Sequence, residues 1–355
     1  MLTASVIGAG MGGNASLKAL ENSPHYDLRA VADISEAARA QVRRRFADVD
    51  TFGDWQSMLR ACPTDVVVVS VPPALHRPAV MDALELPLRG ILVEKPLGHC
   101  LADGRVILNA IRVRGMPICV PHGLLVRTTP LKVLAHVSAG DIGKVQLIEI
   151  RCTGWDIINA GIHWLDFCIT ALDSPDMDHV LALCDTSSRT YRDGLQVETV
   201  AATYAVARDG TRIVMHTGDH VDIGRPGRDT LMRFCGDSGL IEFWPWSEGY
   251  RIVNAHHPGG VDVAPKNRET RTPHQIHLDN LALQIDDDTT DYKIAEDSLK
   301  ALEICDAAYQ SSFHRCRVNL PLDDFVPPPA RDWHPGQPYA GTGGGRNGRK
   351  LLGSP

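Results

Sequence analysis

A glycine-rich turn close to the N-terminus limits the folds open to this chain more than any other stretch. The segment SVIGAGMGGNASLKAL places Gly8, Gly10 and Gly13 in the spacing G-x-G-x-x-G, after a short apolar run and before a helical pattern. In that setting the first glycine permits a tight turn, the second lets the backbone approach a pyrophosphate, and the third allows close packing of helix on strand. The first helical turn also offers free N–H groups to phosphates. The segment therefore predicts a βαβ unit that binds a dinucleotide, with Met11 and Gly12 in the binding turn.

A carboxylate stands where the second strand is expected to end. The segment LRAVADIS gives Asp33, twenty residues after Gly13. An acid at this place accepts hydrogen bonds from a ribose diol and repels a 2′-phosphate. Ile34 and Ser35 follow it, with no adjacent arginine to hold such a phosphate. The sequence therefore favours NAD over NADP, with Asp33 and Ile34 among the contacts of the cofactor.

The first third of the chain alternates short apolar runs with helical patterns. Amphipathic stretches cover 35–46 and 101–114, and the segment DVVVVSVP is apolar nearly throughout, which is typical of a strand buried on both faces. This alternation predicts an α/β fold with a parallel, doubly wound sheet. The strand-like runs are 5–8, 28–32, 66–71, 91–93 and 118–120.

The pattern changes after about residue 121. Many strand-like runs follow with few helices between them, which predicts an α+β domain with an open, mainly antiparallel sheet. Its strand-like runs are 144–154, 179–184, 198–207, 211–217, 230–235, 240–244 and 250–253. Helical patterns cover 130–139, 159–172 with Asn159 as a candidate N-cap, 273–285 and 295–314.

Three parts are therefore expected. They are a Rossmann domain at 1–121, an α+β domain for substrate binding and oligomerisation at 122–326, and a Pro- and Gly-rich tail at 327–355. The tail is predicted to be extended, and Trp333 and Tyr339 leave open that part of it docks on a neighbour.

Composition excludes several classes of partner. The net charge of -7 argues against binding nucleic acid or an anionic membrane surface. No apolar run reaches the roughly 18 residues that cross a bilayer, and the N-terminus enters a strand pattern directly, so no signal peptide is expected.

The nine cysteines form no Cys-x-x-Cys pair and the fifteen histidines no HExxH cluster. We expect reduced thiols, a cytoplasmic protein and no metal site.

Three further motifs place polar groups after expected strands or on an expected helix. They are VSVPPALHRP with Ser70, Pro72 and His76; VEKPLG with Glu94 and Lys95; and NAGIHWLD with Asn159 and His163. A lysine beside a glutamate is by itself compatible with a plain surface turn. Its place directly after a buried strand, downstream of the glycine turn, favours a group held at a cofactor cleft.

Together these motifs resemble the glucose–fructose oxidoreductase / inositol dehydrogenase (Gfo/Idh/MocA) family of sugar dehydrogenases, over roughly residues 3–320. The resemblance implies an active site where the two domains meet and an open sheet that often serves as an oligomer interface. It therefore implies a homodimer or homotetramer that acts on a sugar or polyol. Ser70, Pro72, His76, Glu94 and Lys95 then contact the cofactor, and the bond between Lys95 and Pro96 is expected to be cis.

Oxidation of a secondary alcohol needs a base for the hydroxyl proton and a donor for the forming alkoxide. Lys95 suits the second role and could share the first, and burial there would lower its pKa. His163 suits the first, because an imidazole titrates near neutral pH.

One position departs from the family's pattern, because Asn159 stands where an aspartate is usual. An amide binds a hydroxyl but cannot titrate, so we expect Asn159 to orient substrate. Asp156 could supply the missing charge, or Lys95 and His163 could act directly together. Asp166 is expected to be a supporting residue. The other candidate substrate contacts are His122, Arg127, Trp155 and Asp156, whereas His274 and His277 read as surface or packing residues.

The function expected is an NAD-dependent sugar, cyclitol or polyol dehydrogenase. A redox-neutral alternative is an NAD-using glycosidase or lyase that acts through a transient keto-sugar. A third reading is a binding or regulatory protein, favoured only if Asn159 marks lost chemistry. The substrate itself is not encoded by any of the motifs.

Overall fold

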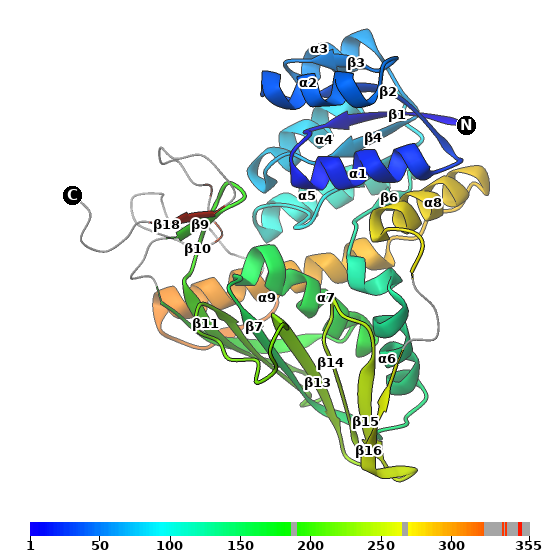
Figure 1. Ribbon diagram of the computed structural model, residues 1–355. Coiled ribbons are helices and arrows are strands. Elements are labelled where there is room, and N and C mark those ends of the chain that lie inside the picture. Colours follow the sequence, from blue (N-terminus) through cyan, green and yellow to red (C-terminus); the bar gives the residue numbers. More distant parts are fainter. Residues whose placement is uncertain (186–189, 265–268, 323–335, 337, 339–346, 350–355) are drawn as a thin grey trace. The chain divides into compact units, whose positions relative to one another are not determined.

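The computed structural model describes residues 1–185, 190–264, 269–322, 336, 338 and 347–349 (Figure 1). The chain divides into two compact units. The N-terminal unit comprises Met1–His122 and Thr270–Leu299, and the C-terminal unit comprises Gly123–Glu269 and Lys300–Pro355. Residues 270–299, which the sequence placed in the second domain, thus belong to the N-terminal unit. The expected docking residues Trp333 and Tyr339 lie outside the described residues.

The N-terminal unit is built on a six-stranded sheet in the order β3-β2-β1-β4-β5-β6, with every pairing parallel. This confirms the predicted doubly wound sheet, and the order is that of dinucleotide-binding folds. All four valines of β4 are fully buried, which explains why its sequence has no polar alternation. The strands are β1 (Leu2–Ile7), β2 (Tyr26–Ala32), β3 (Asp50–Phe52), β4 (Val66–Val69), β5 (Gly90–Val93) and β6 (Ile118–Cys119).

Helices cover this sheet and one of them comes from far along the chain. Helix α8 (Pro273–Asp286) packs with α1, and the Tyr26 hydroxyl donates to the Leu278 carbonyl at 2.6 Å. Leu281 and Ile285 of α8 join the buried core around β1 and β4. The other helices are α1 (Met11–Asn22), α2 (Glu36–Arg45), α3 (Trp55–Ala61), η1 (Pro73–Leu75), α4 (His76–Leu84) and α5 (Leu101–Val113).

The C-terminal unit is built on a nine-stranded sheet in the order β16-β15-β14-β13-β7-β12-β11-β8-β17. Only the pairing of β7 with β12 is parallel among those described, so the predicted mainly antiparallel sheet is confirmed. The strands are β7 (Val145–Thr153), β8 (Met177–Asp185), β11 (Val200–Ala207), β12 (Arg212–Gly218), β13 (Thr230–Gly236), β14 (Leu240–Phe243), β15 (Tyr250–Asn254), β16 (His257–Val263) and β17 (Val318–Asn319).

One face of this sheet holds the core of the unit. Phe167 of α7 (Ile162–Ala171) packs against Phe234 of β13 and Phe243 of β14, with ring centroids 5.9 and 5.5 Å apart. Each fully buried aromatic ring contributes about 2–3 kcal/mol. Helices α6 (Thr128–Ser138) and η2 (Gly123–Val126) also belong to this unit, and α9 (Lys293–His314) begins in the N-terminal unit and continues here. Along β8 exposed and buried residues alternate, which leaves Leu181 and Leu183 exposed.

A separate three-stranded sheet, in the order β10-β9-β18, escaped the sequence analysis. Strands β9 (Thr190–Arg192) and β10 (Leu195–Val197) form a hairpin, and β18 (Asn347–Arg349) pairs with β9. The turn residues Asp193 and Gly194 have φ of 49° and 83°. Asp-Gly is a strong hairpin signal because both positions of such a turn need positive φ. Strands β3 and β16 were also not anticipated.

All nine cysteines are free thiols. In the described part of the chain, no helix combines the length and apolar character that a membrane span requires.

Candidate active site

The glycine turn has the geometry that its spacing predicts. Gly8 has φ of +95°, and a Cβ there would lie 2.5 Å from the carbonyl oxygen of Ser70. A Cβ on Gly13 would lie 1.9 Å from the carbonyl oxygen of Gly8, so helix α1 and the turn touch through backbone alone. A Cβ on Gly10 would meet no atom within 4 Å, and helix α1 begins directly after this residue. The turn is therefore packed at its first and third glycines and open at its second.

Asp33 connects this turn to the end of β2. Its carboxylate accepts hydrogen bonds from the backbone N–H groups of Ala9 and Ser35, each at 2.7 Å. Arg39 donates to the Asp33 carbonyl oxygen at 2.5 Å and pairs with Glu36. No arginine is adjacent to Asp33 in the sequence, but helix α2 brings Arg39 back to it, and Glu36 pairs with that guanidinium.

These groups fit the dinucleotide that the turn predicts. The Ser70 hydroxyl is buried and has no hydrogen-bond partner among the described residues, and it follows β4 beside Gly13. The α1 N-terminus would hold a pyrophosphate, the Asp33 carboxylate a ribose diol, and Ser70 a further polar group of the cofactor. Met11 and Ile34 flank these groups with exposed side chains.

His76 and Pro72 follow β4. Pro72 is exposed and caps η1. The His76 ring is fully buried, with Nε2 at 2.9 Å from the Val71 carbonyl oxygen and Nδ1 at 3.4 Å from that of Leu97. Burial lowers its pKa. His76 thus ties the exit of β4 to the segment after Lys95, and its ring is committed to backbone groups.

Glu94 and Lys95 follow β5 directly. The Glu94 carboxyl lies beside the glycine turn, because a Cβ on Gly12 would be 3.1 Å from it. His274 donates to Glu94 at 2.7 Å. Burial disfavours the Glu94 carboxylate, but the hydrogen bond and charge of His274 and the charge of Lys95 outweigh it, so its pKa is lowered. The bond after Lys95 is cis, as the resemblance implied.

His122 lies in the interior of the N-terminal unit. Its ring is fully buried, with Nε2 2.9 Å from the Ser298 hydroxyl, and burial lowers its pKa well below the usual value. Its carbonyl oxygen accepts from His277 at 3.0 Å, and burial lowers the pKa of His277 to about 4. His277 is thus a packing residue, one of the two readings left open. The burial of His122 does not favour the substrate contact expected for it.

In the C-terminal unit, two candidates gather around a tryptophan that the sequence analysis did not single out. The half-buried His163 ring stands edge-on to Trp246, with centroids 5.5 Å apart. The Arg127 guanidinium lies 5.9 Å from the centre of the same indole and 3.5 Å from the Glu269 carboxylate.

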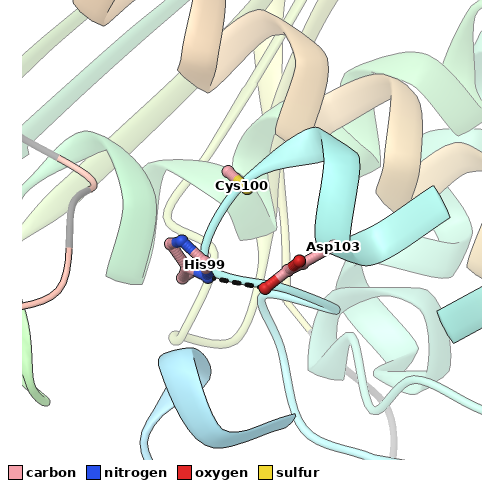
Figure 2. Close-up of side chains that lie close together, drawn as sticks. All are labelled: His99, Cys100 and Asp103. Carbon is pink, nitrogen blue, oxygen red and sulfur yellow. Dashed lines mark ion pairs between the residues drawn. The ribbon is translucent and has the colours of Figure 1, made fainter. Parts of the chain in front are cut away.

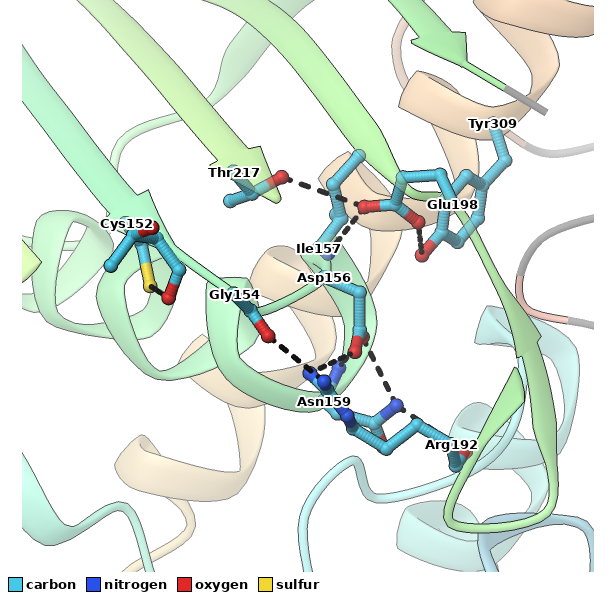
Figure 3. A network of polar contacts seen from close by, with 10 residues as sticks. Cys152, Gly154, Asp156, Ile157, Asn159, Arg192, Glu198, Thr217 and Tyr309 are labelled. Atoms are coloured by element: carbon cyan, nitrogen blue, oxygen red, sulfur yellow. Dashed lines mark hydrogen bonds and ion pairs between the residues drawn. The ribbon is translucent and has the colours of Figure 1, made fainter. Parts of the chain in front are cut away.

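Asn159 and Asp156 belong to one network, drawn in Figure 3. Asn159 does not cap its helix. It lies in a turn of π-helix, η3 (Ile157–Gly161), and Asp156 is the cap, accepting the Asn159 backbone N–H at 2.7 Å. The expected N-cap was wrong because the π-turn starts the helix earlier. Arg192 of β9 pairs with Asp156 at 2.9 Å and lies over the Trp155 ring at 4.3 Å. Asp156 is therefore already engaged as an ion-pair partner and cap.

A second buried acid stands behind this network. Glu198 accepts from the Ile157 N–H at 2.7 Å and from the Tyr309 hydroxyl at 3.1 Å (Figure 3). Burial and the negative charge of Asp156 raise the pKa of Glu198 to about 7. Neither Glu198 nor Arg192 was anticipated from the sequence. The Asp-Gly hairpin after Arg192 was the available signal.

One group of possible metal ligands occurs in the part of the chain that the structure describes: His99, Cys100 and Asp103, with ligand atoms within 4.8 Å of one another (Figure 2). Asp103 pairs with both His99 and Arg77, each at 3.0 Å. Burial disfavours the imidazolium, but the hydrogen bond to Asp103 outweighs it and raises the pKa of His99 to about 10. A protonated imidazole and a guanidinium on one carboxylate do not favour a cation there.

Comparisons with known proteins agree with this geometry. Residues 2–122 match the model of the oxidoreductase family with an NAD-binding Rossmann fold. The inositol 2-dehydrogenase of Rubrobacter xylanophilus is 29% identical over 178 residues, which are 46% of this chain and 50% of that protein. The chain thus spans about half the length of the curated relative it matches.

Solved structures share the fold over most of both chains. Levoglucosan dehydrogenase, in complex with NADH and levoglucosan, has a TM-score of 0.76 at 16% identity, over 90% of this chain and 99% of that one. The myo-inositol 2-dehydrogenase of Lactobacillus plantarum has a TM-score of 0.73 at 15% identity, over the same shares. Residues 2–122 thus match the NAD-binding Rossmann domain of the Gfo/Idh/MocA oxidoreductase family, the family that the sequence motifs resemble.

Proposed function

We propose that this protein is an NAD-dependent dehydrogenase that transfers a hydride between a secondary alcohol of a sugar, cyclitol or sugar derivative and the nicotinamide. The observation that carries the proposal is the place of Lys95. It leaves β5 beside Glu94, whose carboxyl lies against Gly12 of the dinucleotide turn. The substrate class is supported by the inositol and levoglucosan dehydrogenases that this chain is similar to.

Each candidate has a role that its chemistry allows. Bound NAD would accept the hydride from the carbinol carbon. The Lys95 ammonium holds the alcohol oxygen as negative charge develops on it, and the His163 imidazole takes the hydroxyl proton. Asn159 binds a neighbouring hydroxyl, and Arg127 lies with His163 around Trp246. For His76 and His122, whose rings are buried and hydrogen-bonded, a structural role is the better proposal.

The direct test is a screen of inositols, hexoses and anhydrosugars, including myo-inositol and levoglucosan, with NAD or NADP. Formation of reduced cofactor is followed by its absorbance. We expect NADH to form in proportion to oxidised product with at least one polyol. Product without accumulating NADH would identify the redox-neutral alternative, and no reaction with any compound would contradict the proposal.

The cofactor preference is expected to depend on Asp33. In Asp33→Ser the carboxylate that binds the ribose diol is lost, so kcat/KM with NAD should fall about 10-fold. Adding Glu36→Gln removes the partner of Arg39, whose guanidinium then becomes available to a 2′-phosphate. Activity with NADP should rise in the double variant. Asp48→Ser, at an exposed site on the same unit, is the control and should leave the activities with NAD and with NADP unchanged. An unchanged NAD:NADP ratio in both Asp33 variants would contradict the assignment.

We propose that the protein is a homodimer or homotetramer that associates through the nine-stranded sheet. Leu181, Leu183 and Tyr204 are 48%, 68% and 37% exposed on β8 and β11. Apolar side chains clustered on a sheet face are typical of an association surface. Sedimentation should show an oligomer, and Leu183→Lys should shift it to monomer. Leu131→Lys, at an exposed leucine of α6, should leave the assembly intact. A monomeric parent protein would refute this interface.

A cytoplasmic location is proposed as well. Nine free thiols fit a reducing compartment.

A further inference from the structure

The contacts of Asn159 determine which way its side-chain amide is turned. Its Nδ2 donates to Asp156 Oδ1 at 3.0 Å and lies 3.5 Å from the Arg192 carbonyl oxygen (Figure 3). A carboxylate and a carbonyl only accept, so the nitrogen of the amide must face them. The covalent geometry of the amide then directs Oδ1 away from this pair. Asn159 therefore presents its oxygen, which suits a hydroxyl that donates.

Asp156 is what fixes that orientation. Its side chain is 1% exposed, and its two oxygens bind different partners. Oδ1 accepts from both the backbone and the side chain of Asn159, and Oδ2 accepts from Arg192 at 2.9 Å. Removing Arg192 would leave the buried Asp156 carboxylate without its counter-ion, which is costly, whereas removing the Asn159 side chain would take one hydrogen-bond donor from Oδ1.

Arg192 is held in turn by its surroundings. Its other terminal nitrogen donates to the Gly154 carbonyl oxygen at 2.9 Å, and the guanidinium lies over Trp155. Its backbone is in β9, the middle strand of the three-stranded sheet, paired with β10 and β18. Arg192 therefore reaches Asp156 from a strand whose two edges are both hydrogen-bonded.

This arrangement explains why an asparagine and not an aspartate stands at 159. A carboxylate there would place an oxygen about where Nδ2 now lies, 3.0 Å from the Asp156 oxygen. Among the described residues, this network contains two acids, Asp156 and Glu198, and one guanidinium, that of Arg192. Two carboxylates at this distance in a buried site cannot both be ionised, so one of them would take up a proton.

We propose that Asp156 and Arg192 are positioning residues that hold the Asn159 amide with its oxygen toward a substrate hydroxyl, and that they make a neutral amide at 159 a requirement. The inference rests on the proposed function for the identity of that hydroxyl. The network itself is independent of it. In this proposal Asp156 does not take over the role of the aspartate that is usual at position 159.

The test compares Asn159→Asp with the exchange Asp156→Asn/Asn159→Asp. With the polyol that reacts fastest in the screen, the single variant should lose about 100-fold in kcat/KM at pH 8, mainly through KM. Part of this loss should return at pH 5.5, where the extra proton is present. The exchange restores one carboxylate and one amide to the pair, so its activity should exceed that of the single variant at pH 8. Asn109→Asp, which adds a charge at an exposed site on α5, should match the parent.

A readout that needs no substrate separates this inference from the proposed function. In Asn159→Asp the folded-state pKa of the new acid pair is raised, so its contribution to stability is full at low pH and is lost as pH rises through that value. The thermal midpoint, relative to that of the parent protein, should therefore fall between pH 5.5 and pH 8. Among the described residues, the titratable and charged groups around the pair are Arg192, Glu198, Tyr309, Cys152 and Cys305.

The outcomes are distinct. If the parent oxidises no polyol, the proposed function fails, and the pH-dependent midpoint still decides the network. The positioning role is overturned if Asn159→Asp has the parent's midpoint at both pH values, or if the exchange is no better than the single variant in activity and in midpoint.

Discussion

Replacing Lys95 with methionine is expected to lower kcat by about 10³-fold while the affinity for NADH changes little. Methionine keeps the length and apolar stem of the side chain but removes the ammonium. The lysine follows β5 and its charge acts on Glu94, which lies against the glycine turn. Loss of the ammonium leaves the developing alkoxide without its donor, so the effect falls on turnover. Rates are measured with the fastest polyol of the screen, and NADH binding by its fluorescence.

The matched control is Lys18→Met, which removes a charge from an exposed position on α1 of the same unit. It should retain the parent's kcat. The proposed role would be contradicted if Lys95→Met kept more than about a tenth of the parent's turnover, or if its whole loss came from weaker NADH binding.

The parallel sheet of the N-terminal unit, apart from β3, could be predicted because its signals are local. Gly8, Gly10 and Gly13 lie within one turn, and the run of four valines in β4 by itself predicts a buried parallel strand. What the sequence could not show were partners brought by distant segments. His274 lies far from Glu94 along the chain, and only the packing of α8 with α1 brings it to that carboxylate.

The candidate site in the C-terminal unit was less predictable for a related reason. The motif around His163 was visible, but the consequence of Asn159 depended on Arg192, which lies on a separate hairpin. Spacing also suggested Asn159 as the N-cap, because a π-turn leaves no mark in the hydrophobic pattern. Trp246, which lies near both His163 and Arg127, belongs to none of the motifs found in the sequence.

A pair of glycine variants is expected to separate folding from cofactor binding. In Gly13→Ala the new methyl group would lie 1.9 Å from the backbone oxygen of Gly8, and neither backbone segment can move away cheaply. We expect the free energy of unfolding to fall by about 3 kcal/mol and NADH affinity to fall at least about 100-fold.

In Gly10→Ala the methyl group meets no atom within 4 Å, so the protein should fold with only the modest cost of alanine at a helix N-cap, about 1 kcal/mol. The same methyl group stands where the backbone must approach a pyrophosphate, so NADH affinity should still fall about 100-fold. Thermal unfolding and NADH fluorescence measure the two effects independently. If Gly10→Ala bound NADH like the parent protein, the open side of the turn would not be the place where the dinucleotide binds. If Gly13→Ala were as stable as the parent, the close contact between α1 and the turn would not be what fixes a glycine there.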